Sequence, residues 1–73
     1  MVVNAQKIKE LREKENLSTY ALAEKVYTSQ SMITHIENKI KEPSVGLLLR
    51  IADYFKVSTD YLLDRDNPEA KIS

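Results

Sequence analysis

Residues 17–38 read LSTYALAEKVYTSQSMITHIEN, and they contain the clearest structural pattern in the chain. Ser18 and Ser29 each precede a short segment whose apolar residues recur at helical spacing. Serine is a preferred helix N-cap, because its side chain accepts a hydrogen bond from a backbone N–H of the first turn. We therefore predict two short helices and a tight link between them: 18–26, the link 27–28, and 29–38.

The outward face of the second helix is polar and almost uncharged. At about 100° per residue, Ile33 and Ile36 point toward a core, and the opposite side carries short polar side chains: Gln30 at the tip, then Ser31, Thr34, His35 and Asn38. Helices that face only water usually carry Glu, Lys and Arg, whereas base edges require short donors and acceptors. The pattern favours a helix-turn-helix whose second helix lies in a major groove. The alternative is a polar face that meets only solvent.

Three further helices complete the predicted fold. Asn4, Ser44 and Ser58 stand at N-cap positions before segments that end near Glu15, near Phe55 and shortly after Leu62. No stretch alternates like a strand. We predict an all-α protein, a compact five-helix bundle in which residues 4–63 form one domain and residues 64–73 form a frayed C-terminal tail.

Composition excludes several classes of protein. The 73 residues include no cysteine and one histidine, which leaves no thiolate metal site and no plausible catalytic constellation. We expect no enzyme activity, no metal and no cofactor. No apolar stretch is long enough for a signal peptide or a membrane span, so we expect a cytoplasmic protein with no membrane partner.

Net charge is zero, but it is unevenly distributed. Residues 1–41 carry seven basic and five acidic side chains, and residues 42–73 carry four basic and six acidic ones. Charge alone would not predict a nucleic-acid-binding protein. Because residues 1–41 carry the excess of basic side chains, we expect this part of the chain to face DNA.

An ordered set of short motifs resembles the lambda-repressor-like family, and most closely its Xre-type bacterial and phage regulators. The resemblance covers residues 4–63 approximately and rests on six pieces: Leu17-Ser18-x3-Leu22-Ala23-x2-Val26, Ser29-x3-Ile33-x2-Ile36-Glu37-Asn38, Pro43-Ser44, Leu48, Ile51-Ala52 and Val57-Ser58-x-Asp60-Tyr61-Leu62-Leu63. It implies a sequence-specific regulator, most often a repressor, of double-stranded DNA.

The resemblance also implies roles for individual residues. Base-reading positions are matched by Gln30, Ser31 and His35, and Thr34 is added to them because it lies on the same outward face. Phosphate-binding positions are matched by Ser18, Thr19, Tyr20, Asn38, Lys39 and Lys41. An internal ion pair between the first and third helices is matched by Arg12 and Glu37, for which the alternative is a solvated charge on the first helix.

Two residues depart from the family pattern. The family usually has glutamine at Thr19, where it contacts phosphate and braces the first base-reading residue. With the shorter threonine, either Gln30 is less constrained or Tyr20 takes over the phosphate contact. The turn usually has glycine or asparagine at Tyr27, because φ is often positive there. A tyrosine in that conformation costs about 1 kcal/mol or more, which favours a differently built turn.

One recognition helix reads few base pairs, so we expect a homodimer on an inverted repeat. The predicted interface is the C-terminal part, with Tyr54, Tyr61, Leu62 and Leu63, flanked by Ile40 and Val45. The competing interpretation is that these side chains close the bundle and that dimers form only on DNA. A second class of function also remains: an interaction module, such as an antitoxin, that docks a toxin or another protein antagonist and also represses its own gene.

Overall fold

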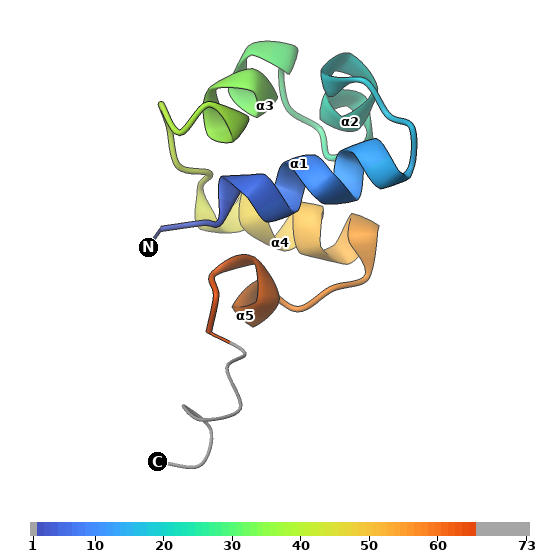
Figure 1. Cartoon of the computed structure of the whole chain (residues 1–73). Coiled ribbons are helices and arrows are strands. Elements are labelled where there is room, and N and C mark those ends of the chain that lie inside the picture. Colours follow the sequence, from blue (N-terminus) through green and yellow to red (C-terminus); the bar gives the residue numbers. More distant parts are fainter. Residues whose placement is uncertain (1, 66–73) are drawn as a thin grey trace, which may run out of the picture.

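The computed structural model describes residues 2–65, and these form five helices. They are α1 (Ala5–Lys14), α2 (Thr19–Lys25), α3 (Gln30–Glu37), α4 (Val45–Phe55) and α5 (Thr59–Leu62). α2 and α3 lie together at one end of the molecule, α1 and α4 cross beneath them, and α5 lies at the other end (Figure 1). The predicted all-α, five-helix fold is confirmed, and each helix ends within a residue or two of its predicted end.

Each helix begins at its predicted cap. In all five, the cap side chain accepts a hydrogen bond from the backbone N–H three residues later; the caps are Asn4, Ser18, Ser29, Ser44 and Ser58. Each cap satisfies one donor that the first turn of a helix otherwise leaves unpaired. The positions of the helices are therefore set by local chemistry that the sequence displays directly.

Each helix also ends in the same way, with one residue in the left-handed conformation. The φ angles of these residues lie between 56° and 63°, and none is glycine: Asn16, Tyr27, Lys39, Lys56 and Asp64. The residue after each donates its N–H back into the last turn, as Thr28 does to the Ala23 carbonyl at 2.9 Å. The expectation of a differently built turn at Tyr27 was wrong, because these returning hydrogen bonds require φ = 58° there.

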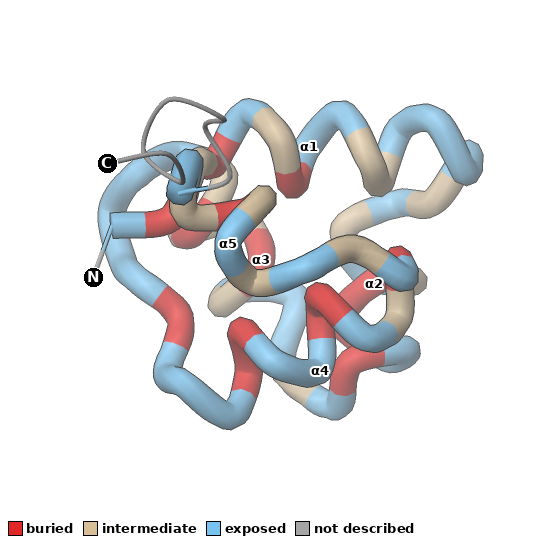
Figure 2. Tube along the Cα trace, turned by 90° about the horizontal axis from the view of Figure 1, so that it is seen from below, coloured by how far each residue is buried: buried red, intermediate tan, exposed pale blue. Residues whose placement is uncertain are grey.

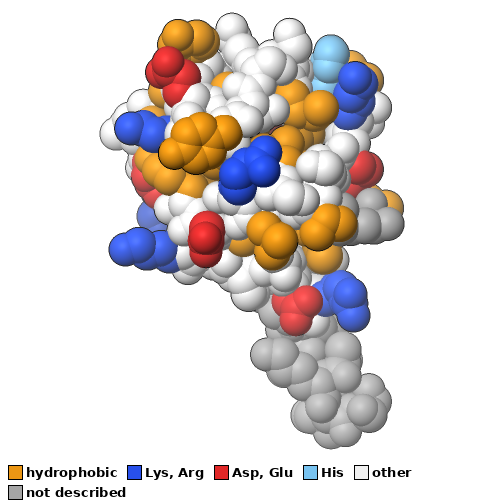
Figure 3. Space-filling model, turned by 180° about the vertical axis from the view of Figure 1, so that it is seen from behind, with side chains coloured by type: hydrophobic (Ala, Val, Ile, Leu, Met, Phe, Trp, Pro, Cys, Tyr) orange, Lys and Arg blue, Asp and Glu red, His pale blue; other side chains and the backbone are white. Residues whose placement is uncertain are grey.

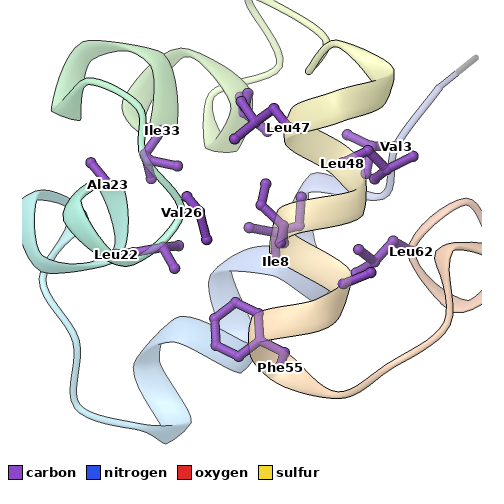
Figure 4. Packing of buried hydrophobic residues seen from close by; sticks show 13 residues of the cluster. Val3, Ile8, Leu22, Ala23, Val26, Ile33, Leu47, Leu48, Phe55 and Leu62 are labelled. Carbon is purple, nitrogen blue, oxygen red and sulfur yellow. The ribbon is translucent and has the colours of Figure 1, made fainter.

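A single apolar core holds the helices together. Ile8 of α1, Leu22 of α2 and Ile33 of α3 are fully buried, and Ile51 of α4 and Leu62 of α5 join them. The buried positions of α1 and α4 face each other across the molecule (Figure 2). Side chains from every helix meet around Ile8 (Figure 4). α3 packs mainly against α2 and α1 and shares this core with the other helices.

The two ends of the described chain are tied together. The Asn4 N–H donates to the Leu62 carbonyl at 2.7 Å, and the Lys7 ammonium lies 4.0 Å from the centre of the Tyr61 ring. Lys7 pairs with Asp64 at 2.8 Å, and the Asn4 amide donates to the same carboxylate at 2.9 Å. Both bonds lower the pKa of Asp64, and the bond to Lys7 has the larger effect. Asp64, the first residue of the predicted frayed tail, is therefore held, whereas residues 66–73 of that tail lie outside the described residues.

We expect Tyr27→Asn to raise the free energy of unfolding by about 1 kcal/mol, because the left-handed conformation costs a non-glycine residue about 1–2 kcal/mol and asparagine adopts it more readily. Tyr27 is 82% exposed, so little packing is lost. Urea unfolding measures the change. Tyr20→Asn is the control, because Tyr20 is also exposed but lies within α2, where asparagine brings no gain. A Tyr27→Asn variant no more stable than the unmodified chain would contradict the strain argument.

Candidate DNA-binding surface

The exposed side of α3 carries the residues predicted to read bases. Gln30 and Ser31 are exposed at the start of the helix, and Thr34 and His35 are half-buried further along. Ile33 and Ile36 on the opposite side are buried. The polar side of α3 is therefore held outward by its apolar side, at the end of the molecule where α2 and α3 lie (Figure 1).

Thr19 and Gln30 are joined across the two helices. The Gln30 side-chain amide donates to the Thr19 hydroxyl oxygen at 3.0 Å. The expectation that threonine leaves Gln30 less constrained was wrong, because the hydroxyl of the short side chain is within hydrogen-bonding distance. One N–H and the carbonyl oxygen of Gln30 stay available, which are the donor and the acceptor needed for an adenine edge.

The start of α2 presents the other polar groups of this surface. Ser18 is exposed, and its hydroxyl caps α2 by accepting from the Ala21 N–H at 3.0 Å. The Tyr20 hydroxyl donates to Glu24 of the same helix at 3.2 Å. A phosphate contact by Tyr20 therefore has to replace this hydrogen bond, whereas Ser18 and Thr19 lie at a helix N-terminus, which favours anions.

The chain that leaves α3 is fixed by backbone hydrogen bonds. The N–H groups of Ile40 and Lys41 both donate to the His35 carbonyl, at 2.8 and 3.2 Å. Lys39 takes the left-handed conformation that this turn needs. Asn38, Lys39 and Lys41 are all exposed. The two lysines therefore directly follow α3, on a segment whose backbone is held by these hydrogen bonds.

Arg12 and Glu37 lie together and join α1 to α3. The guanidinium binds the carboxylate through two hydrogen bonds of 2.7 and 3.0 Å, and a third nitrogen donates to the Leu17 carbonyl at 2.7 Å. The side chains are only 12% and 7% exposed. The hydrogen bond to Glu37 raises the pKa of Arg12, against the opposing effect of burial. The geometry is that of a structural ion pair and not of a solvated charge.

Sequence reasoning missed one link behind the helix-turn-helix. The Arg50 guanidinium of α4 donates to the Val26 carbonyl at 2.8 Å, at the point where α2 ends. This carbonyl lies in the last turn of a helix, where the partial negative charge favours a cation. An arginine on the exposed side of a helix gives no sequence signal for such a contact.

The C-terminal residues predicted as a dimer interface mostly close the bundle. Leu62 was wrongly assigned, because it is 0% exposed and belongs to the core. Tyr61 and Leu63 are partly buried against that core. Tyr54 is also partly buried, with its ring edge-to-face against Phe55 at 5.1 Å. The competing interpretation therefore describes these four side chains better than an interface does.

Within residues 2–65, no group of three or more His, Asp or Glu side chains is placed to hold a metal ion. The same residues include no helix of sufficient length and apolarity to cross a membrane.

Comparison with known proteins identifies the family. The helix-turn-helix family profile matches residues 8–62. The HTH-type transcriptional regulator ImmR of Bacillus subtilis (strain 168) is 30% identical over 66 residues, which are 90% of this chain and 52% of ImmR. The chain thus spans about half the length of this relative.

Solved structures agree with that match. The P22 c2 repressor bound to a synthetic operator has a TM-score of 0.80 at 31% identity, over 85% of this chain and 94% of that one. SinR bound to DNA has a TM-score of 0.76 at 32% identity, over 88% of this chain and 100% of that one. SinR in complex with the SinI protein has a TM-score of 0.77 at 28% identity, over 99% of this chain and 73% of that one. The protein is a member of the helix-turn-helix family of DNA-binding transcriptional regulators, of the Xre and lambda-repressor type.

Proposed function

We propose that the chain represses transcription in the cytoplasm by binding an inverted-repeat operator as a homodimer, with α3 in the major groove. The observation that carries this proposal is the outward side of α3, where Gln30 is braced by Thr19 and followed by Ser31, Thr34 and His35. Base readout requires side chains held in one geometry, because each base contact depends on paired donors and acceptors. A merely solvated helix has no need of that brace.

Binding would be anchored on both sides of the recognition helix. Ser18 and Thr19 at the start of α2 would contact one phosphate group, and Asn38, Lys39 and Lys41 after α3 would contact another. Phosphate contacts set the position of the protein, and base contacts set its specificity. Because the net charge of the chain is zero, the chain as a whole adds no electrostatic attraction for DNA. Most of the attraction to phosphate would therefore come from Lys39 and Lys41.

Selection of bound duplexes from a random DNA pool tests the proposal directly. We expect an inverted repeat whose half-sites lie about 34 Å apart, one turn of the double helix. Enrichment of a single unrepeated site would contradict the homodimer. A pool from which no sequence is enriched would contradict sequence-specific binding altogether.

Lys41→Ala should weaken binding to every duplex alike and reduce the slope of log affinity against log salt by about one unit, because one phosphate contact is lost. Lys9→Ala is the matched control, because Lys9 is an exposed lysine of α1 that is not in the proposed phosphate-binding set. Fluorescence anisotropy at several salt concentrations measures both slopes. Equal slopes for the two variants would remove Lys41 from the phosphate-binding set.

A second candidate function is docking of a protein antagonist or toxin. SinR, a structural neighbour, forms a complex with the SinI protein, and a net charge of zero suits a protein partner as well as DNA. Salt-sensitive binding to the DNA upstream of the chain's own gene would favour the regulator. Its absence, with a stable protein complex instead, would favour the docking module.

A further inference from the structure

The outer face of α4 carries apolar side chains that the chain does not cover. Val45 and Leu49 are 64% and 54% exposed and lie one helical turn apart. Gly46 and Asp53, also exposed, lie on the same side within an arc of about 100°. We call these four residues the α4 face. Figure 3 looks at the side of the molecule on which α4 lies and shows hydrophobic side chains at its surface.

No turn or positive φ requires a glycine at Gly46. It is the only glycine in the sequence, its φ is not positive, and a Cβ added there would lie 3.4 Å from a guanidinium nitrogen of Arg50, which is an ordinary van der Waals contact. Glycine in a helix lowers stability relative to alanine. Glycine also allows close approach of another backbone, and no backbone of residues 2–65 lies against Gly46, so such a backbone would come from outside them.

The α4 face is complementary in charge to itself. Asp53 makes no ion pair within the described residues, and the first turn of α4 contains no acidic residue. Asp53 lies about 12 Å along the helix from Val45, on the same side. In an antiparallel pair of α4 helices, each Asp53 lies beside the first turn of the other helix, where the helix dipole favours a carboxylate. Gly46 lets the two helices approach at that point.

The orientation of α4 suits a dimer that binds DNA. α4 runs across the molecule beneath α2 and α3 (Figure 1). A two-fold axis that passes just outside α4 beside Leu49, perpendicular to the helix and directed toward the side of α3, makes the two α4 helices antiparallel and leaves both copies of α3 on one side. That arrangement is required by an inverted repeat. α1 lies on the opposite side of the molecule and stays clear of the contact (Figure 2).

We propose that a second copy of this chain occupies the α4 face, through an antiparallel contact of the two α4 helices centred on Leu49. This inference rests on the proposed operator-binding homodimer and names its interface. The α4 face thus replaces the C-terminal residues as the proposed dimer interface, because the side chains of those residues mostly pack within the bundle.

The test is a charge-exchange experiment at Leu49. Leu49→Glu and Leu49→Lys each place two like charges next to the axis, so each variant alone should sediment as a monomer. An equimolar mixture should recover the dimer, because opposite charges then meet. Gln6→Glu is the control for added negative charge, since Gln6 is exposed on α1. Thermal melting of all variants checks that the bundle stays folded.

Binding to selected duplexes separates the interface from the function. Each Leu49 variant should bind a single half-site as the unmodified chain does, and should lose at least about tenfold in affinity for the two-half-site duplex. Recovery by the mixture on the full duplex supports the proposal. Leu49 variants that dimerise and bind like the unmodified chain overturn the interface but leave the proposed function intact.

An unmodified chain that is monomeric in free solution and on the full duplex overturns the interface. Failure to enrich any sequence from the pool overturns the proposed function. In that case, recovery of a dimer by the mixed Leu49 variants in free solution still supports the α4 contact, and failure to recover one overturns it.

Discussion

Glu37→Ala should be the most destabilising substitution among the polar residues of this protein. It removes both carboxylate acceptors of Arg12 and leaves a guanidinium that is only 12% exposed, with the Leu17 carbonyl as its remaining partner. Breaking a buried pair from one side costs about 3–5 kcal/mol. For a domain of this size that lowers the melting temperature by about 12 °C or more. Circular dichroism during heating measures the shift.

Two controls distinguish a buried ion pair from a general effect of substitution. Asp64→Asn breaks the Lys7 pair, whose carboxylate is 55% exposed, and should shift the melting temperature much less. The double variant with Arg12→Met and Glu37→Leu should recover much of the stability lost in Glu37→Ala, because no buried charge is left unpaired. A shift of only a degree or two for Glu37→Ala would mean that the pair is solvated in solution.

The double variant also has a functional consequence. Glu37 is the last residue of α3, and its ion pair with α1 fixes the helix that is proposed to read bases. If the pair serves only stability, the double variant should keep the sequence preference of the unmodified chain. A double variant that is stable but has a relaxed preference would show that the pair also orients α3.

The sequence predicted the helices well because their ends depend on local signals. Five cap side chains were visible as Asn or Ser before apolar periodicity, and all five accept hydrogen bonds in the structure. The left-handed residue that follows each helix was harder to predict, because lysine, tyrosine and aspartate do not by their type indicate a positive φ. Tyr27 shows the limit: its residue type argued against the conformation that two returning hydrogen bonds impose.

Contacts between helices were predictable only where the family resemblance supplied them. Arg12 and Glu37 lie together as the resemblance implied. The sequence could not predict the Thr19–Gln30 hydrogen bond, because this bond depends on how closely the starts of α2 and α3 approach each other. The error at Leu62 has a related cause: apolar side chains show how much surface must be buried, but not whether their own bundle or a second copy buries it.

Gln30→Ala should cost about 1–3 kcal/mol of binding free energy, roughly 5- to 150-fold in affinity, and should relax the preference at one base pair of each half-site. The Gln30 amide donates a hydrogen bond of 3.0 Å to the Thr19 hydroxyl, which restricts the Gln30 side chain before DNA is bound. Less side-chain entropy is then lost when Gln30 binds a base. Selection of duplexes with the variant, followed by anisotropy measurements on single-base changes, locates the affected pair.

Substitutions at Thr19 test the brace separately from the base contact. Thr19→Val keeps the shape but removes the hydroxyl acceptor, so the preference at the Gln30 base pair should weaken by less than it does in Gln30→Ala. Thr19→Ser keeps the hydroxyl and should preserve that preference. Lys41→Ala should lower affinity for all duplexes without changing their order. If Gln30→Ala leaves the order of preferred sequences as unchanged as Lys41→Ala does, the start of α3 does not read bases, and the recognition surface lies elsewhere on this fold.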